Sequence, residues 1–518
     1  MVEKTQGDAE IIANDIKQLH SMGYAQELAR RLRAFSNFAI SFSIICILSG
    51  GINSIMQGIS GVGGASIGLG WPIGCFVSLL FALGLAQISS SFPTAGGLYH
   101  WGSILGGKGW GWVTAWLNLL GLVTVLGAIN VGTFLFFQGA FGTPLHIDNT
   151  PINQFIFVTI ITVIQALINH RGIRLTAILT DFSGYLIFFG AIAIALAYFA
   201  FAATHDFSRL WTFTNYSGDV GGGVWPQSNS MLYVFLLGLL LPIYTITGYD
   251  ASAHTSEETV DAARAVPTSM VRSVVWSFIL GWLFLIAFVL AIPNMSDAAK
   301  QGGNVFFWTS DAVLPPAIKY FLYVIIFVSQ FLCGLATVTS ASRMIFAFSR
   351  DGGLPFSNTL RKVHATFRTP VAAIWLAAVL AVLFTIYTPV YTTIVSVTVI
   401  FLFLSFTVPI FFALRAYGKR WSQMGPWNMG GLFKPVAVLV LVGMALIFYI
   451  GVQPPNDSAL YITIGFLILT AIVWFVFERR RFSGPPQGTM IQERMRAISE
   501  AERAVGETAA GVSTSPAK

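Results

Sequence analysis

Charged side chains are scarce in this sequence. They make up 10% of its 518 residues, whereas hydrophobic residues make up 55%, and the mean hydropathy is +0.72. An average soluble domain carries about 25% charged residues. So few charges cannot cover a water-facing surface, which excludes a soluble globular protein and indicates a chain that folds in lipid.

Cysteines are few, and several functional motifs are missing. Cys46, Cys75 and Cys333 have neither disulfide nor metal-ligand spacing, so we interpret them as apolar packing residues. The absence of a GxxxxGK[ST] loop argues against ATP-driven transport by this chain alone. The net charge of +7 does not come from a basic patch interleaved with aromatics, so we predict no nucleic-acid partner. We also expect no metal and no cofactor.

Residues suited to catalysis are dispersed along the chain. No His/Asp/Glu cluster falls at the middle of an apolar run. His100, His170 and His254 lie near run ends, where we interpret them as interfacial. We therefore predict that the protein is not an enzyme.

Long apolar runs, in contrast, are abundant, and each reaches the ~20 residues needed to cross a bilayer as a helix. They lack the period-two alternation of membrane strands, and lipid cannot satisfy open sheet edges. The predicted fold class is an all-α integral membrane protein with twelve transmembrane helices. The runs are 36–58, 69–91, 110–141, 152–170, 178–203, 230–254, 272–293, 316–348, 370–388, 391–415, 434–453 and 459–477.

Lysine and arginine are concentrated in alternate connections between these runs. This bias predicts a multi-pass protein of the cell (inner or plasma) membrane with both termini in the cytoplasm. Residues 1–35 lack the pattern of a secretory signal peptide, so we expect the first apolar run to target the chain. The expected segments are a cytoplasmic segment 1–35, a five-helix block 36–203, an external loop 204–229, a second block 230–417, two helices within 434–478, and a cytoplasmic tail 479–518 without fixed structure.

The first and sixth runs each contain residues that interrupt helices. Ser49, Gly50, Gly51 and Asn53 fall inside the first run, and Gly248 falls inside the sixth. Each of these runs begins a block of five, and matched interruptions are the sequence pattern of a transporter site. Glycine also lets membrane helices pack closely, which is the alternative interpretation.

Asp250 is a carboxylate within the sixth run. A charge at the centre of a membrane helix costs ~2.5–3.5 kcal/mol on insertion scales, so it normally faces a cavity or a partner. We favour ammonium recognition or proton coupling by Asp250. The alternative is a helix-end residue wetted from the cytoplasm, because Glu257 and Glu258 follow it.

Four motifs in order carry a resemblance to a known family. They are GYAQELARRLRAFSNFAISFSI (23–44), FPTAGGLYHW (92–101), TGYDASAHTSEET (247–259) and SRMIFAFSRDGGLP (342–355). Together they resemble the amino acid–polyamine–organocation (APC) permeases, and most of all the amino acid/choline branch that includes GABA and choline permeases. The resemblance implies a 5+5 inverted repeat of the leucine-transporter type, two further C-terminal helices, and alternating access around a central site.

The resemblance also implies a substrate site and a gate. The substrate carboxylate is expected at backbone amides of the broken first helix, and carbonyls and a gating side chain are expected from the broken sixth. Arg343, Arg350 and Asp351 are expected to make the ion pairs of a cytoplasmic gate with Glu257, Glu258 or Asp261. In the alternative, Arg343 and Arg350 only anchor the helix end at lipid headgroups. The predicted substrate-binding residues are Ser49, Gly50, Gly51, Ile52, Asn53, Thr247, Gly248, Tyr249, Asp250 and Ala251.

The coupling ion is left open between H⁺ and Na⁺, with uncoupled exchange as a third case. Thr337, Thr339 and Ser340 lie where sodium-coupled proteins of this fold complete a sodium site, although such hydroxyls also serve in helix packing. Asp250 is the alternative, as a proton carrier.

The predicted function is secondary active transport of an amino acid or a related small amine such as GABA. The alternatives are a choline, ethanolamine or polyamine permease of the same fold, and a nutrient sensor that binds such ligands without transport. The predicted partners are the small-molecule substrate and the lipid bilayer.

Overall fold

The computed structural model describes residues 6–387, 390–486 and 488–504. Within these ranges the chain is helical, with two isolated β-bridges and no β-strand. The principal helices are α1 (Gln6–Ser21), α2 (Ala34–Ile45), α3 (Ile47–Asn53), α4 (Ile55–Val62), α5 (Trp71–Ser91), α6 (Leu98–Gly106), α7 (Lys108–Leu145), α8 (Pro151–His170), α9 (Ile173–Phe201), α10 (Met231–Gly238), α11 (Leu240–Thr245), α12 (Ala251–His254), α13 (Ala262–Ala291), α14 (Met295–Lys300), α15 (Val305–Val313), α16 (Pro316–Arg350), α17 (Ser357–Leu360), α18 (Val371–Tyr387), α19 (Tyr391–Ala416), α20 (Phe433–Gly451), α21 (Ser458–Val473), α22 (Arg479–Arg481) and α23 (Thr489–Ala504).

Ten helical segments of the described ranges are long and apolar enough to cross a membrane. Two further apolar helices, Met231–Thr245 and Val371–Tyr387, are shorter. They correspond to the predicted runs 230–254 and 370–388. The first is short because the helix stops after Thr245, and residue 388 at the end of the second lies outside the described residues.

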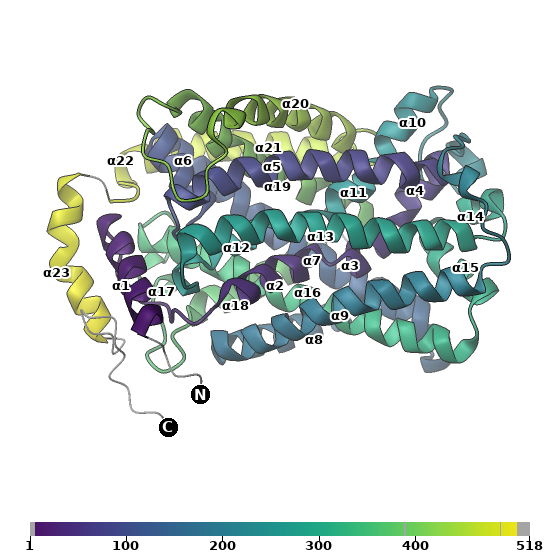
Figure 1. The fold of residues 1–518 in the computed structure, drawn as a ribbon, viewed down its shortest axis with the longest axis horizontal. Helices are drawn as coiled ribbons and strands as arrows, with labels where there is room; N and C mark the ends of the chain where they lie inside the picture. The colour runs from purple at the N-terminus through teal and green to yellow at the C-terminus, as the bar shows by residue number, and fades with distance from the viewer. Residues whose placement is uncertain (1–5, 388–389, 487, 505–518) are drawn as a thin grey trace.

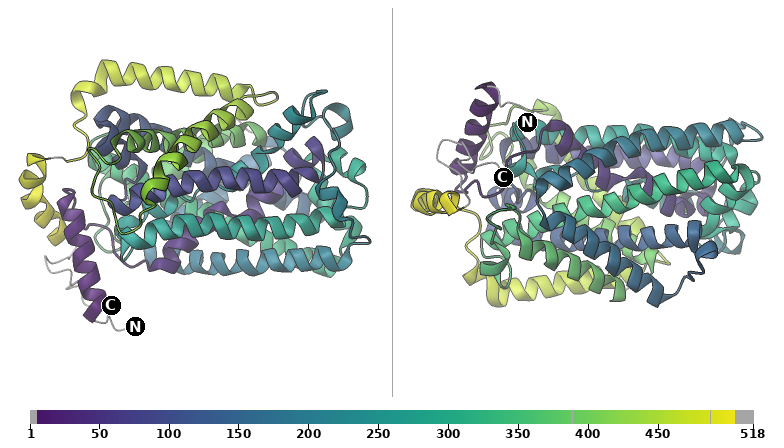
Figure 2. Two further views of the ribbon diagram at one scale, coloured as in Figure 1. Left: turned by 45° about the horizontal axis from the view of Figure 1, so that its top comes forward. Right: turned by 90° about the horizontal axis from the view of Figure 1, so that it is seen from below.

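The long helices run side by side along the long axis of the molecule (Figure 1). We call the end that carries α1 and α23 the α1 end, and the opposite end, with α14 and α15, the α14 end. The spans Ala34–Val62 and Lys108–Leu145 are each 89% buried over their most apolar window, whereas Ser458–Arg481 is 11% buried. The first interrupted helix and α7 therefore form the centre, and α21 lies on the outside (Figure 2).

The first interruption lies at Cys46, between α2 and α3. Cys46 has φ +25°, which is rare for a residue with a side chain. The sequence predicts the interruption at Ser49–Asn53, but these residues form most of the short helix α3, which is bounded by departures from helical geometry at Cys46 and at Ser54. A Cβ on Gly50 would lie 2.9 Å from Cα of Thr245, so this glycine permits close packing and does not break the helix.

The second interruption separates α11 from α12 and lies where the sequence predicts it. Gly248 has φ +90°, and a Cβ there would lie 2.2 Å from Cγ2 of Ile44. Both the backbone conformation and the available space therefore require glycine at this position. Ile44 comes from the last turn of α2, so the two interruptions lie directly against each other.

The tail 479–518 is more ordered than the sequence predicts, because residues 489–504 form α23. Glu502 on α23 accepts hydrogen bonds from Nε2 of His20 at 2.6 Å and from the backbone N–H of Gln26 at 2.9 Å. These contacts with the N-terminal segment give α23 a partner that composition alone does not reveal. Residues 505–518 lie outside the described residues.

Candidate functional site

A small cavity lies between the two interruptions. Its volume, about 10 Å³ for the centre of a water-sized sphere, has room for about one water molecule. An amino acid is several times larger than water, so this conformation is closed around its centre. The lining residues are Ile44, Ile45, Ser49, Gly50, Val125, Ile129, Tyr244, Thr245, Thr247 and Cys333.

Three of the ten predicted substrate-binding residues line this cavity, namely Ser49, Gly50 and Thr247. The others lie around it without lining it. A Cβ on Gly51 would meet the Phe284 ring of α13, so this glycine faces away from the cavity. Ile52 and Asn53 lie at the end of α3, and Gly248 lies against Ile44. The ring of Tyr249 lies 5.3 Å from that of Phe406, and Ala251 packs with Ile40 and Ala336. Asp250 lies in a separate polar cluster.

Sequence reasoning missed the cavity residues contributed by uninterrupted helices. Val125 and Ile129 come from α7 and Cys333 from α16, and all three sit in ordinary apolar runs. No motif distinguishes them from packing residues. Tyr244 lies beside the second interruption in the sequence, and its ring lies 6.3 Å from that of Tyr391.

Donors from α16 contact the carbonyls around the first interruption. Sγ of Cys333 donates to the carbonyl of Ile44 at 3.2 Å, and Nε2 of Gln330 donates to the carbonyl of Leu48 at 3.2 Å. A helix break leaves carbonyls without their usual partners, which is costly in an apolar interior. Cys333 therefore has a polar role in addition to the packing role that the sequence predicts.

Asp250 belongs to a buried polar cluster that does not include the residues lining the cavity. Its Oδ2 accepts a hydrogen bond from Nδ2 of Asn118 at 3.2 Å and lies 3.3 Å from Nε2 of His254. Nδ2 of Asn118 also donates to Oγ of Ser405 at 3.3 Å. The side chains of Asp250 and His254 are both fully buried. Asp250 is the N-cap of α12 but is fully buried, so the alternative that it is wetted from the cytoplasm is wrong.

Two of the three histidines interpreted as interfacial are buried instead. His254 lies beside Asp250, and His100 is 1% exposed. Both occupy short helices that pack inside the bundle, α12 and α6, so their positions near the ends of apolar runs were misleading.

The hydroxyls considered for a sodium site make different contacts. Oγ1 of Thr337 donates to the carbonyl of Cys333 within its own helix at 2.9 Å. Oγ1 of Thr339 donates to Oδ1 of Asn169 on α8 at 2.6 Å. Oγ of Ser340 is buried and has no hydrogen-bond partner among the described residues. Two of these three hydroxyls thus have protein partners.

Two buried ion pairs lie beyond the Asp250 cluster, toward the α1 end. Arg343 binds Glu258 through Nε and Nη2, both at 2.9 Å, and Arg350 binds Glu257 through Nη2 at 2.7 Å and Nη1 at 3.0 Å. Arg343 is 1% exposed and both glutamates are fully buried. These two-bond pairs join α16 to the segment after α12, so the headgroup-anchor alternative does not describe these arginines.

Glu257 remains ionised in this setting. Burial opposes its charge, but Arg350 and a 3.1 Å hydrogen bond from the backbone N–H of Ala95 outweigh burial and hold the pKa of Glu257 below its usual value. The guanidinium of Arg350 also lies 3.9 Å from the centre of the Tyr24 ring. The Tyr24 ring of the N-terminal segment therefore covers the guanidinium of the second ion pair.

Asp351 does not take part in the two ion pairs and is bound instead by two tyrosine hydroxyls and a histidine. It accepts hydrogen bonds from the hydroxyls of Tyr24 at 2.7 Å and Tyr99 at 3.0 Å, and Nε2 of His100 lies 3.4 Å away. Burial disfavours ionisation of Asp351, but His100, Arg350 and the hydrogen bond from Tyr24 keep the pKa of Asp351 below its usual value. The predicted partner Asp261 lies elsewhere, 3.9 Å from Arg264 at the surface.

The N-terminal segment crosses the α1 end as an extended strap, residues 22–33. The backbone N–H groups of Arg31 and Leu32 both donate to the carbonyl of Glu258 at 2.8 Å, and Leu32 accepts from the backbone of Val260 at 2.9 Å. Nε2 of Gln26 donates to the carbonyl of Glu257 at 2.8 Å. The strap therefore binds the same two residues that carry the buried ion pairs.

Comparisons with known proteins give a consistent result over nearly the whole chain. The sequence model of the family described as Amino acid permease matches residues 32–477. The Amino-acid permease BAT1 homolog of Oryza sativa subsp. japonica is 31% identical over 503 residues, which cover 90% of this chain and 95% of that protein. The GABA-specific permease of Saccharomyces cerevisiae is 28% identical over 509 residues, which cover 92% of this chain and 87% of that protein.

Proposed function

Because the chain belongs to the amino acid permease family, we propose that it is a secondary active transporter for an amino acid or a related small amine such as GABA. The observation that carries this proposal is the cavity where the two interrupted helices meet. Matched interruptions of membrane helices offer free backbone groups to a polar substrate at mid-membrane.

We propose twelve crossings arranged as a 5+5 inverted repeat with α20 and α21 added outside it. The ten long spans and the two shorter apolar helices together supply twelve apolar segments. The interrupted segments α2–α4 and α10–α12 would begin the two repeats. The low burial of the last span supports a peripheral place for the final helices.

The α1 end is the cytoplasmic end in this proposal. Lysines and arginines are concentrated in the connections on the side that carries α1 and α23. Basic connections remain preferentially in the cytoplasm.

The substrate is proposed to occupy the cavity after α3 and α11 move apart. Its carboxylate would lie near Ser49 and Gly50 at the beginning of α3, where the helix end carries partial positive charge. Its ammonium group would lie near the ring of Tyr244 and the carbonyls that follow Thr245. The ion pairs Arg343–Glu258 and Arg350–Glu257 would act as the cytoplasmic gate and would separate when the substrate is released.

For coupling we propose protons carried by Asp250. The supporting observation is the fully buried carboxylate of Asp250, whose Oδ2 lies 3.3 Å from Nε2 of His254. Asp250→Asn should abolish accumulation driven by a pH gradient while exchange of bound substrate persists. Unchanged proton-driven uptake by this variant, or accumulation that requires Na⁺, would contradict proton coupling through Asp250.

Transport by purified protein in liposomes tests the function directly. Labelled GABA, several amino acids, choline and ethanolamine would be followed under imposed H⁺ or Na⁺ gradients, with protein-free liposomes as the control. We expect saturable accumulation of GABA or an amino acid. Uptake of choline or ethanolamine alone would favour the organic-cation alternative, and binding without flux would favour a sensor.

A further inference from the structure

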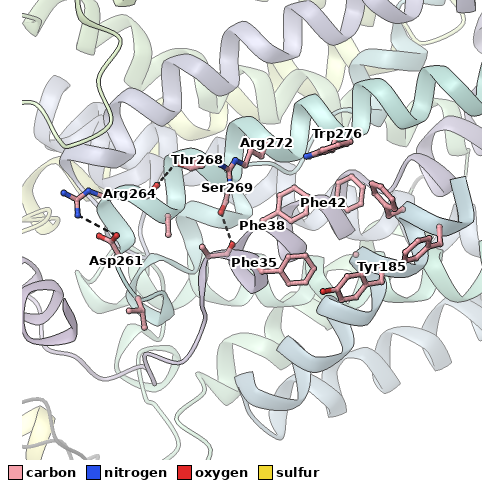
Figure 3. A pocket seen from close by; sticks show the side chains of 16 residues that line it. Phe35, Phe38, Phe42, Tyr185, Asp261, Arg264, Thr268, Ser269, Arg272 and Trp276 are labelled. Carbon is pink, nitrogen blue, oxygen red and sulfur yellow. Dashed lines mark hydrogen bonds and ion pairs between the residues drawn. The ribbon is translucent and has the colours of Figure 1, made fainter. Parts of the chain in front are cut away.

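A separate groove lies on the outside of the bundle between α2, α9 and α13, close to the α1 end (Figure 3). Its volume is about 630 Å³. The three helices belong to the candidate membrane spans Ala34–Val62, Ile173–Phe201 and Ala262–Ala291. The groove therefore opens toward the bilayer, and it does not include the residues that line the cavity between the interruptions.

Seven of the sixteen residues that line the groove are aromatic. The rings of Phe35 and Tyr185 stack with centres 5.0 Å apart, and those of Phe188 and Trp276 meet edge to face at 5.8 Å. Phe35, Tyr185 and Trp276 are 41%, 54% and 42% exposed, respectively. Such a row of outward-facing rings offers a long apolar surface to a flexible chain.

Two arginines extend this apolar surface toward the α1 end. Figure 3 shows Arg264 beside Asp261 at one end of the groove, Arg272 further along α13, and Trp276 and Phe42 toward the other end. Arg264 lies 3.9 Å from Asp261, and both side chains are exposed. Arg272 is exposed and makes no hydrogen bond or ion pair among the described residues.

We propose that this groove binds an anionic phospholipid, with the phosphate at Arg272 and an acyl chain along the aromatic walls. Basic pockets between membrane helices are suited to anionic headgroups, and guanidinium groups form paired hydrogen bonds with phosphate. A sterol would fill the apolar part but leave Arg272 without an anion. The bound lipid would join α2, which leads into the interruption at Cys46, to α9 and α13.

The order of charge along the groove agrees with this ligand. Arg264 lies at one end of the groove, Arg272 lies further along α13, and the rings of Trp276 and Phe42 lie beyond Arg272, in the order of the headgroup and the acyl chain of one lipid. Oγ of Ser269 donates to the carbonyl of Ala34 at 3.3 Å at the floor of the groove. The floor is therefore closed by a contact between α13 and α2, and the ligand stays on the lipid side.

Native mass spectrometry of the full chain tests the site by lipid retention, which does not depend on transport. The protein would be titrated with phosphatidylglycerol and, separately, with phosphatidylcholine. We expect preferential retention of phosphatidylglycerol by the unaltered protein and at least a fivefold loss of this preference in Arg272→Gln. Trp276→Ala should weaken retention of both lipids, because it removes apolar wall. Glycerol phosphate, which has the headgroup chemistry without acyl chains, should not compete.

The matched control is Arg174→Gln, which removes an exposed arginine of α9 outside the groove and should retain the preference. A diazirine on the acyl chain of phosphatidylglycerol should crosslink to peptides of α2, α9 or α13. Equal retention of the two lipids, an equal loss in Arg174→Gln, displacement by a sterol, or a second copy of the chain in place of lipid would each overturn the proposal. Thermal stability of each variant in detergent distinguishes lost binding from lost folding.

Discussion

The two interrupted helices differ in how they are held. The first departs from helical geometry at Cys46, and its carbonyls are contacted by neutral donors from α16, Cys333 and Gln330. The second leaves helical geometry between Thr245 and Ala251, and buried Arg–Glu pairs follow directly after it. Charge therefore anchors the second interruption to α16, whereas weak polar contacts hold the first. We expect α2 and α3 to be displaced more easily than α11 and α12.

The largest effect is expected from Gly248→Ala, at the second interruption. A left-handed conformation costs a non-glycine residue ~1–2 kcal/mol, and the new Cβ would also overlap Ile44, with 2.2 Å between the two carbons. Two carbons cannot approach so closely, so α2 would have to move away, and the cost of this displacement adds to that of the strained backbone. Gel filtration of detergent-solubilised protein should show mostly aggregate, and uptake should be lost. Gly107→Ala is the control, because its φ is also positive but nothing lies within 4 Å. A normal elution profile for Gly248→Ala would show that the second interruption can relax.

Breaking one buried ion pair should have the next largest effect. Arg343→Met leaves Glu258 buried without its partner, and such a loss costs ~3–5 kcal/mol when the charge cannot reach water. The melting temperature in detergent should therefore fall sharply, and Glu258→Gln added to Arg343→Met should recover most of it. Arg33→Gln, at an exposed pair with Asp8, should change stability by only ~0–1 kcal/mol. If the double variant were no better than Arg343→Met, the unpaired charge would not be the cause.

A smaller effect on stability, but a clear one on transport, is expected from Gly50→Ala at the contact between the interruptions. The added carbon would lie 2.9 Å from the backbone of Thr245, so α3 and α11 must separate slightly. Overpacking of this kind costs ~1–3 kcal/mol. The folded protein should persist while the initial uptake rate in liposomes falls. Gly51→Ala faces the movable ring of Phe284 and should be milder, so equal losses in the two variants would remove the argument from close packing.

The sequence predicted the membrane-helical fold and the second interruption because both depend on local composition. Hydropathy reveals apolar spans, and Gly248 is required by its own backbone. The sequence misplaced the first interruption, because Gly50 permits close packing against Thr245, a residue distant in the sequence, and does not break the helix. The motif at 342–355 identified Arg343 and Arg350 as candidates for buried ion pairs, but it did not show which carboxylates they bind. Val125, Ile129 and Cys333 could not be predicted, because a residue lining a cavity from an intact helix looks like any packing residue.

The smallest effect, and the sharpest test of how the first interruption is held, is expected from Cys333. Cys333→Ala leaves the carbonyl of Ile44 without its side-chain donor, and a typical hydrogen bond contributes about 1 kcal/mol. Cys333→Ser keeps a donor at the same position and should recover part of the loss. Because Cys333 also lines the cavity, the melting temperatures should be compared without substrate. If serine and alanine were equally destabilising, packing and not the hydrogen bond would hold the interruption at Cys46. The first interruption would then be held by packing and by the hydrogen bond from Gln330, and the second by buried ion pairs, which are harder to separate.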